Sequence, residues 1–138
     1  GIAISDDNMA VISPSSYQVL CAPWNEALSK RFGGIAVHSC GLVAHNLPQL
    51  LAIDGLKQFD CKVTDYEPND AQKLAELFSG KDAILKVCVF PNENHERLLP
   101  LLRSDIKLIV QVITSGTVDE CNRQYDHVAQ FVWDHWKR

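Results

Sequence analysis

The sequence predicts an α/β protein built from five parallel strand-then-helix units. Short apolar runs alternate with helix-like segments along the chain, and glycines and helix-capping residues separate the units. The runs at 84–90 and 106–113 are nearly continuously apolar and rich in β-branched residues, as expected of strands buried in a parallel sheet. With 138 residues, 46% of them hydrophobic, the chain can fold as one domain over residues 1–138.

The first unit is expected to contain a strand, an acidic loop and a capped helix. Residues 1–5 form an apolar, strand-like run, and acidic loop residues follow it. Ser13 is a good N-cap with Pro14 at the first helical position, so a helix is expected from there to the glycine pair after Phe32. The other strands are expected at 35–38, 59–63, 84–90 and 106–113, and the other helices at 47–51, 70–78, 94–102 and after the Thr117–Glu120 capping box.

This pattern leaves the topology of the sheet open. Five parallel strands can keep the curvature of a partial (β/α)8 barrel, or they can flatten into an open doubly wound sheet. We expect helices on both faces of the sheet in either case.

Composition excludes several classes of protein. The net charge of −4 is modest and the 13 Lys and Arg residues are scattered, which argues against a nucleic-acid partner. The apolar stretches are shorter than the ~20 residues of a membrane span, and no signal segment opens the chain, so a cytoplasmic protein is expected. The five cysteines are odd in number and widely spaced, which favours reduced thiols.

The segment His38-Ser39-Cys40-Gly41 carries the most distinctive chemistry. Residues two apart on an extended chain project to the same side, so His38 and Cys40 can present a ring nitrogen and a thiolate to one point. A zinc ion there would hold Cys40 as thiolate and leave positions open for a substrate, and Gly41 permits the turn away. The alternative is a hydrogen-bonded histidine beside a buried, inert cysteine.

The sequence around this segment resembles the uroporphyrinogen decarboxylase superfamily. The similarity lies in the stretches Ile2–Asp7, Ser13-Pro14 with Pro23, Gly34–Gly41 and Leu47–Leu51, and more weakly in Gly116–Glu120. Within that superfamily, His-x-Cys-Gly is similar to the branch of cobalamin-dependent (corrinoid) methyltransferases.

This resemblance implies a fold and an activity. The fold is a (β/α)8 barrel of the uroporphyrinogen decarboxylase type, with this chain as its C-terminal part, supplying five of the eight units. The activity is a methyl transfer from a corrinoid protein to a zinc-activated thiol, with His38 and Cys40 as zinc ligands. The family's third ligand, a later cysteine, would lie beyond Arg138. The decarboxylase branch uses no metal, and decarboxylation by a longer parent protein is the alternative activity.

Four further residues are weaker candidates for binding substrate, because they follow predicted strands where ligands gather in parallel sheets. They are Asp6, Asp7, Asp65 and Asn92. Asp6 and Asp7 could meet either substrate or metal, while ordinary solvated loop positions are the alternative for all the acidic residues. His95 and Asp65 could reach across to the zinc site, whereas Cys61 and Cys88 lie inside strands and are poor substitutes for the third ligand.

The leading hypothesis is therefore that the chain is part of a zinc-dependent, corrinoid-linked methyltransferase. By itself it is expected to be inactive and to bind zinc weakly. The second is a non-catalytic half-barrel that pairs with a missing barrel segment from another chain or with itself. Because a partial barrel exposes sheet edges, a homo-oligomer is expected. The pair Trp133 and Trp136 suits core or interface packing.

Overall fold

A computed structural model, which describes residues 1–136, contains one sheet of five parallel strands. The strands lie side by side in the order in which they occur along the chain, so the predicted α/β class with a parallel sheet is confirmed. They are β1 (Ile2–Ser5), β2 (Ile35–His38), β3 (Leu56–Lys62), β4 (Ile84–Val89) and β5 (Leu108–Val112).

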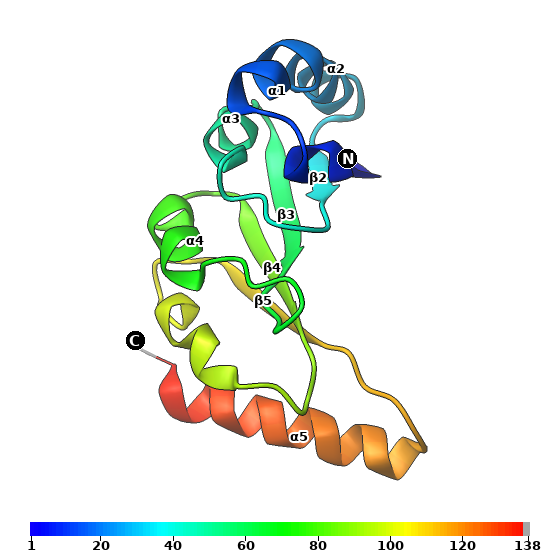
Figure 1. Cartoon of the computed structure of the whole chain (residues 1–138), viewed down its shortest axis with the longest axis vertical. Helices are drawn as coiled ribbons and strands as arrows, with labels where there is room; N and C mark the ends of the chain where they lie inside the picture. Colours follow the sequence, from blue (N-terminus) through cyan, green and yellow to red (C-terminus); the bar gives the residue numbers. More distant parts are fainter. Residues whose placement is uncertain (137–138) are drawn as a thin grey trace.

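Helical segments connect the strands (Figure 1). The α-helices are α1 (Pro14–Leu20), α2 (Ala22–Phe32), α3 (Leu47–Leu51), α4 (Ala71–Phe78) and α5 (Val118–His135). Two 3₁₀ segments, η1 (Asp7–Ala10) and η2 (His95–Leu101), follow β1 and β4. Within the described residues, none of the helices is both long and apolar enough to span a membrane.

Two expected helices differ from the prediction. The helix expected from Ser13 to Phe32 is divided at Cys21, because Pro23 lacks an N–H and is accommodated at the start of α2. The segment after Asn94 is a 3₁₀ helix with Pro100 inside it, rather than an α-helix. The caps themselves are as expected: Ser13 accepts a hydrogen bond from the backbone N–H of Ser16, and Asn94 from that of Glu96.

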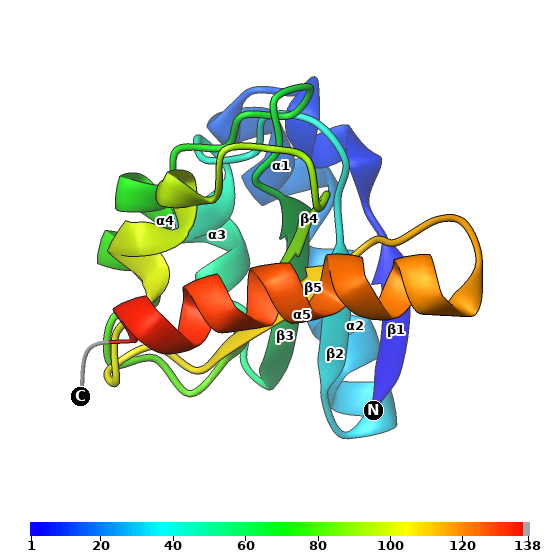
Figure 2. The ribbon, with the colours of Figure 1, turned by 90° about the horizontal axis from the view of Figure 1, so that it is seen from below.

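The helices pack on one face of the sheet, and this face holds the core. Ile35, Phe59, Leu85 and Val87 are fully or almost fully buried there, and the Phe59 ring stacks on Phe78 of α4 with 6.2 Å between centroids. Figure 1 shows α3 and α4 on the same side of the strands. The view from below in Figure 2 shows α5 crossing the β5 end of the sheet.

The opposite face is polar and partly open to solvent. Its residues come from alternate strand positions and share rows across the sheet: Ser5 pairs in register with His38, His38 with Asp60, and Asp60 with Lys86. The side chains of His38, Lys62 and Lys86 are between a quarter and about a third exposed. The expectation of helices on both faces is therefore wrong for residues 1–136, because crossovers that advance in one direction place their helices on one side.

Candidate metal centre

The strand ends of β1 and β2 bring together one carboxylate, one imidazole and one thiol. Ligand atoms of Asp7, His38 and Cys40 all lie within 4.8 Å of one another. His38 Nε2 and Cys40 Sγ are 3.3 Å apart. Ordinary zinc bond lengths and tetrahedral angles separate a nitrogen and a sulfur ligand by about 3.5 Å, so the pair is already close to the spacing of a metal site.

His38 and Cys40 converge because of the end of β2. His38 is the last strand residue, and Ser39 still pairs with the sheet through its N–H to the carbonyl of Asp60, at 3.0 Å. The chain is thus held beside β3 as far as Ser39, and Gly41 then turns it with φ of +83°. A Cβ atom at Gly41 would lie only 2.7 Å from the Cβ of Ala10, so the turn requires glycine.

Asp7 reaches the same point from the neighbouring strand. It opens η1 directly after β1, and the backbone N–H of Asp6 donates to the His38 carbonyl at 2.8 Å. Asp7 Oδ1 accepts a hydrogen bond from the backbone N–H of Cys40 at 2.8 Å. The Asp7 carboxylate therefore fixes the backbone of Cys40 and also lies within 4.8 Å of its sulfur.

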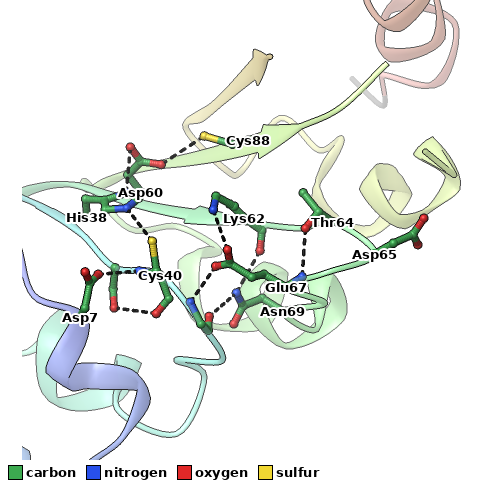
Figure 3. Close-up of polar contacts among 12 residues, drawn as sticks. Asp7, His38, Cys40, Asp60, Lys62, Thr64, Asp65, Glu67, Asn69 and Cys88 are labelled. Carbon is green, nitrogen blue, oxygen red and sulfur yellow. Dashed lines mark hydrogen bonds and ion pairs between the residues drawn. The ribbon is translucent and has the colours of Figure 1, made fainter. Parts of the chain in front are cut away.

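Asp60 of β3 orients the imidazole from the other side. Its Oδ2 lies 3.4 Å from His38 Nδ1, and its Oδ1 accepts from the Cys88 thiol at 3.5 Å (Figure 3). Oδ2 also lies 3.0 Å from Lys86 Nζ. A carboxylate on Nδ1 leaves Nε2 as the lone-pair nitrogen, which faces Cys40. The proton of the neutral His38 ring is therefore assigned to Nδ1 on the basis of its two partners, Asp60 and Cys40.

The charges around Cys40 favour its neutral form. Burial raises the pKa of the Cys40 thiol above its usual value, and the carboxylates of Asp7, Glu67 and Asp60 raise it further, although Lys62 acts in the opposite direction. Cys40 is therefore a thiol at neutral pH in the absence of a cation. A bound metal ion would supply the positive charge that stabilises the thiolate.

The other predicted site residues are not gathered at this point. Asp6 is only 7% exposed, and its Oδ2 accepts from Tyr17 Oη at 3.0 Å and Asn25 Nδ2 at 2.7 Å, so its carboxylate is bound within the fold. Asp65 forms an ion pair with Arg97 and lies away from Cys40 in Figure 3. Asn92 is exposed in the turn after β4.

The substitutes considered for a third ligand also lie elsewhere. His95 is buried, with Nε2 on the carbonyl of Phe90 at 3.0 Å. Cys61 points into the core, where burial keeps the pKa of its thiol far above the usual value. Cys88 contacts Asp60 on the open face, and its pKa is raised to about 11, mainly by burial.

Sequence reasoning missed Asp60, Lys62 and Lys86 as neighbours of the site. The signal was present, because Asp60 and Lys62 alternate with buried Phe59 and Cys61 in β3, so both must face the same side as His38. It missed Glu67 and Asn69 as well, whose contacts with Gly41 span 26 and 28 residues. No local pattern indicates such contacts.

Comparison with models of protein families, with curated proteins and with solved structures gives no match for this chain. Membership of the uroporphyrinogen decarboxylase superfamily therefore stays a prediction from the residues quoted above.

Proposed function

We propose that Asp7, His38 and Cys40 bind a zinc ion that activates a thiol for methyl transfer. The single observation that carries this proposal is the convergence of one oxygen, one nitrogen and one sulfur donor within 4.8 Å at the strand ends. The donor types suit zinc, and three protein ligands leave a tetrahedral position for substrate, as in catalytic zinc sites. When bound, the metal would lower the pKa of a substrate thiol and so make a sulfur nucleophile available near neutral pH.

The chain's own residues prepare this site in three ways. Asp60 holds the imidazole of His38 through Nδ1, which fixes the orientation of the ring. Asp7 holds the Cys40 backbone and offers a carboxylate oxygen. Lys86 pairs with Asp60 at 3.0 Å and offsets part of the negative charge beside the ligands.

The type of fold is part of the same proposal. Strands in sequential order, with helices on one face and polar side chains on the other, support a partial (β/α)8 barrel rather than a doubly wound sheet, whose strand order reverses. In such barrels the chemistry lies at the carboxyl ends of the strands, where this centre lies. By the family resemblance, the methyl donor is a corrinoid protein and the acceptor is a thiol.

Metal content tests the proposal directly. We expect purified protein to hold about one equivalent of zinc per chain by elemental analysis, and Cys40→Ser and His38→Ala to lose it. Asp7→Asn should weaken binding without abolishing it, because the nitrogen and sulfur ligands remain. Cys121→Ser on α5 is the matched control and should bind as the wild type does. Unchanged zinc affinity in Cys40→Ser would refute the proposal.

A second candidate function, assembly with another copy of the chain, rests on the sheet edges. In the described part of the chain, β1 pairs with β2 alone and β5 with β4 alone, so each has an unpaired edge. Ile109 of β5 is 43% exposed, and Trp133 of the neighbouring α5 is 76% exposed. Exposed strand edges beside apolar side chains favour association.

Sedimentation velocity over a range of concentrations tests this second function. We expect a concentration-dependent dimer or larger species in the wild type. Ile109→Lys, which places a charge on the open edge strand, should shift it toward monomer. Lys57→Gln, an exposed change on central β3, is the control. A monodisperse wild-type monomer at micromolar concentration would count against assembly.

A further inference from the structure

The turn that carries Cys40 is held by a loop distant in sequence. We propose that Glu67 and Asn69 are positioning residues for the metal centre, and this proposal rests on the proposed function. Both lie in the loop between β3 and α4, defined here as residues 64–69, which we name the bracing loop. Figure 3 shows this loop beside the Cys40 turn, opposite Asp7.

Glu67 joins the turn to β3 through both of its carboxylate oxygens. Oε2 accepts from the backbone N–H of Gly41 at 2.7 Å, and Oε1 accepts from Lys62 Nζ at 2.6 Å. The hydrogen bond from Lys62, followed by that from Gly41, lowers the pKa of Glu67. The side chain of Glu67 is thus a charged acceptor held between a lysine of the sheet and the turn, although 21% of it remains exposed.

Asn69 makes a second, more buried connection. It is 4% exposed, and its Nδ2 donates to the carbonyls of Gly41 and Lys62, each at 2.9 Å. Its Oδ1 accepts from the backbone N–H of Val43 at 3.0 Å. One amide therefore satisfies three backbone groups, and two of them belong to the turn that follows Cys40.

The turn depends on these partners because it has few contacts of its own. Residues 39, 40, 42 and 43 have no helix or strand assignment, and the conformation at residue 41 excludes any side chain. Between Cys40 and Val43, backbone N–H groups are bound by Asp7 on one side and by Glu67 and Asn69 on the other. The position of the Cys40 sulfur is therefore set by the loops after β1 and β3, in addition to its own strand.

The bracing loop is itself ordered by short-range contacts. Thr64 is 1% exposed, and its Oγ1 accepts from the backbone N–H of Glu67 at 3.0 Å. The backbone N–H of Thr64 returns a bond to the Glu67 carbonyl at 3.2 Å, and Val63 forms an antiparallel bridge with Pro68. The loop can thus act as a firm support for the turn.

Cobalt titration of the full chain separates positioning from simple stability. Co²⁺ bound to a thiolate gives a ligand-to-metal charge-transfer band, which reports the Cys40–metal bond directly. We expect Glu67→Ala and Asn69→Ala to raise the dissociation constant for Co²⁺ by about 10- to 100-fold and to weaken this band. Glu67→Gln, which keeps an acceptor for Gly41, should restore most of the affinity.

Two further measurements make the test independent of folding. Ala75→Gly in α4 lowers stability without touching the turn, and it should bind Co²⁺ as the wild type does. Hydrogen exchange of the metal-free protein should show faster exchange at Gly41 in Glu67→Ala than in the wild type. Because Glu67 is partly exposed, this variant tests the proposal even if Asn69→Ala fails to fold.

The outcomes are distinguishable. If the wild type binds Co²⁺ and Cys40→Ser does not, but Glu67→Ala keeps full affinity and an unchanged charge-transfer band, positioning by the bracing loop is refuted and the metal centre stands. If Ala75→Gly weakens binding as much as Glu67→Ala, the effect is one of stability and positioning is again refuted. If the wild type binds no Co²⁺, both proposals fail.

Discussion

At the scale of single residues, Asp60 has the most connected side chain of the polar face. It contacts His38 of β2 and both Lys86 and Cys88 of β4, the two strands that flank its own. A carboxylate that is only 14% exposed and has several partners is well suited to hold a ring rather than to react. Its role can be tested apart from that of the ligands themselves.

We expect Asp60→Ala to weaken zinc binding by about 10- to 100-fold, because His38 loses the group that fixes the orientation and the tautomer of its ring. Competition with a chromophoric chelator measures the affinity. Asp82→Ala serves as the control, since Asp82 is a fully exposed partner of Lys107 and should leave the affinity unchanged. Equal affinities of wild type and Asp60→Ala would show that the contact has no part in binding.

A second residue-scale prediction concerns Tyr17, whose hydroxyl donates to Asp6 at 3.0 Å. Burial, and then the charge of Asp6, raise the pKa of Tyr17 well above its ordinary value of 10.0. Below that value both the folded and the unfolded states keep the proton. As pH rises beyond it, the unfolded state ionises while the folded state does not, so stability falls.

Tyr17→Phe should therefore cost about 1–2 kcal/mol at neutral pH through the lost hydrogen bond. The difference in free energy of unfolding between variant and wild type should then narrow above pH 10. The wild type loses stability there because Tyr17 ionises in its unfolded state, whereas phenylalanine has no group to ionise. Urea unfolding at pH 7 and pH 10.5 measures both effects. Tyr125→Phe, at an exposed position on α5, should follow the wild type at both pH values. An equal difference in free energy of unfolding at both pH values would contradict the raised pKa of Tyr17.

At the scale of elements, α5 shows how local sequence fixes a boundary. Thr117 and Glu120 form the predicted capping box, with Thr117 Oγ1 accepting from the Glu120 N–H and the Glu120 carboxylate accepting from the Thr117 N–H at 2.7 Å. The two residues are three positions apart, so no tertiary contact is needed to form the capping box. The cap supplies a larger share of the stability of α5 than it would in a well-buried helix, because Val128 is the only fully buried residue within the described length of α5.

We expect Thr117→Ala to lower the free energy of unfolding by about 1 kcal/mol, the usual value of an N-cap. Asn122→Ala, on the exposed surface of the same helix, should cause no loss, because alanine is the better helix former. Chemical denaturation monitored by circular dichroism compares the three proteins. A loss in Asn122→Ala as large as that in Thr117→Ala would show that the cap is not the cause.

At the scale of the whole molecule, the sheet has one buried and one open face. Adjacent residues of β3 should therefore differ sharply in their effect on stability. We expect Phe59→Ala to cost about 3–5 kcal/mol, because Phe59 is fully buried against Phe78, and Gln58→Ala to stay within about 1 kcal/mol. Urea midpoints measure both. Similar losses would indicate that the polar face is also covered in the folded protein.

The fold class could be predicted because its signals are local. Strand 84–89, the cap at Ser13 and the capping box at Thr117 each depend on residues within one turn or one strand, and all are present in the structure. The division at Cys21 and the 3₁₀ form of η2 were not predicted. In both, a proline redirects a helix that hydrophobic spacing alone would continue.

The candidate site was only partly predictable. His38 and Cys40 are two residues apart, so the alternation of side chains along an extended backbone is enough to predict that they project to the same side. Asp7 was one of several acidic loop residues, and only the pairing of β1 with β2 selects it over Asp6, which turns inward to Tyr17. The bracing loop, which follows β3, reaches Gly41 and Val43 in the turn after β2, and this depends on β3 lying beside β2 in the sheet.

The sequence by itself thus determined the strand-and-helix pattern, the caps and the His-x-Cys pair. Tertiary structure alone decided that the strands lie in sequential order, that the helices share one face, and that Asp7, Asp60, Glu67 and Asn69 surround the pair. The physical reason is distance along the chain. Backbone geometry and capping act over a few residues, whereas the contacts of the Cys40 turn with Asp7, Glu67 and Asn69 join residues from 26 to 33 positions apart, and packing of the whole sheet sets them.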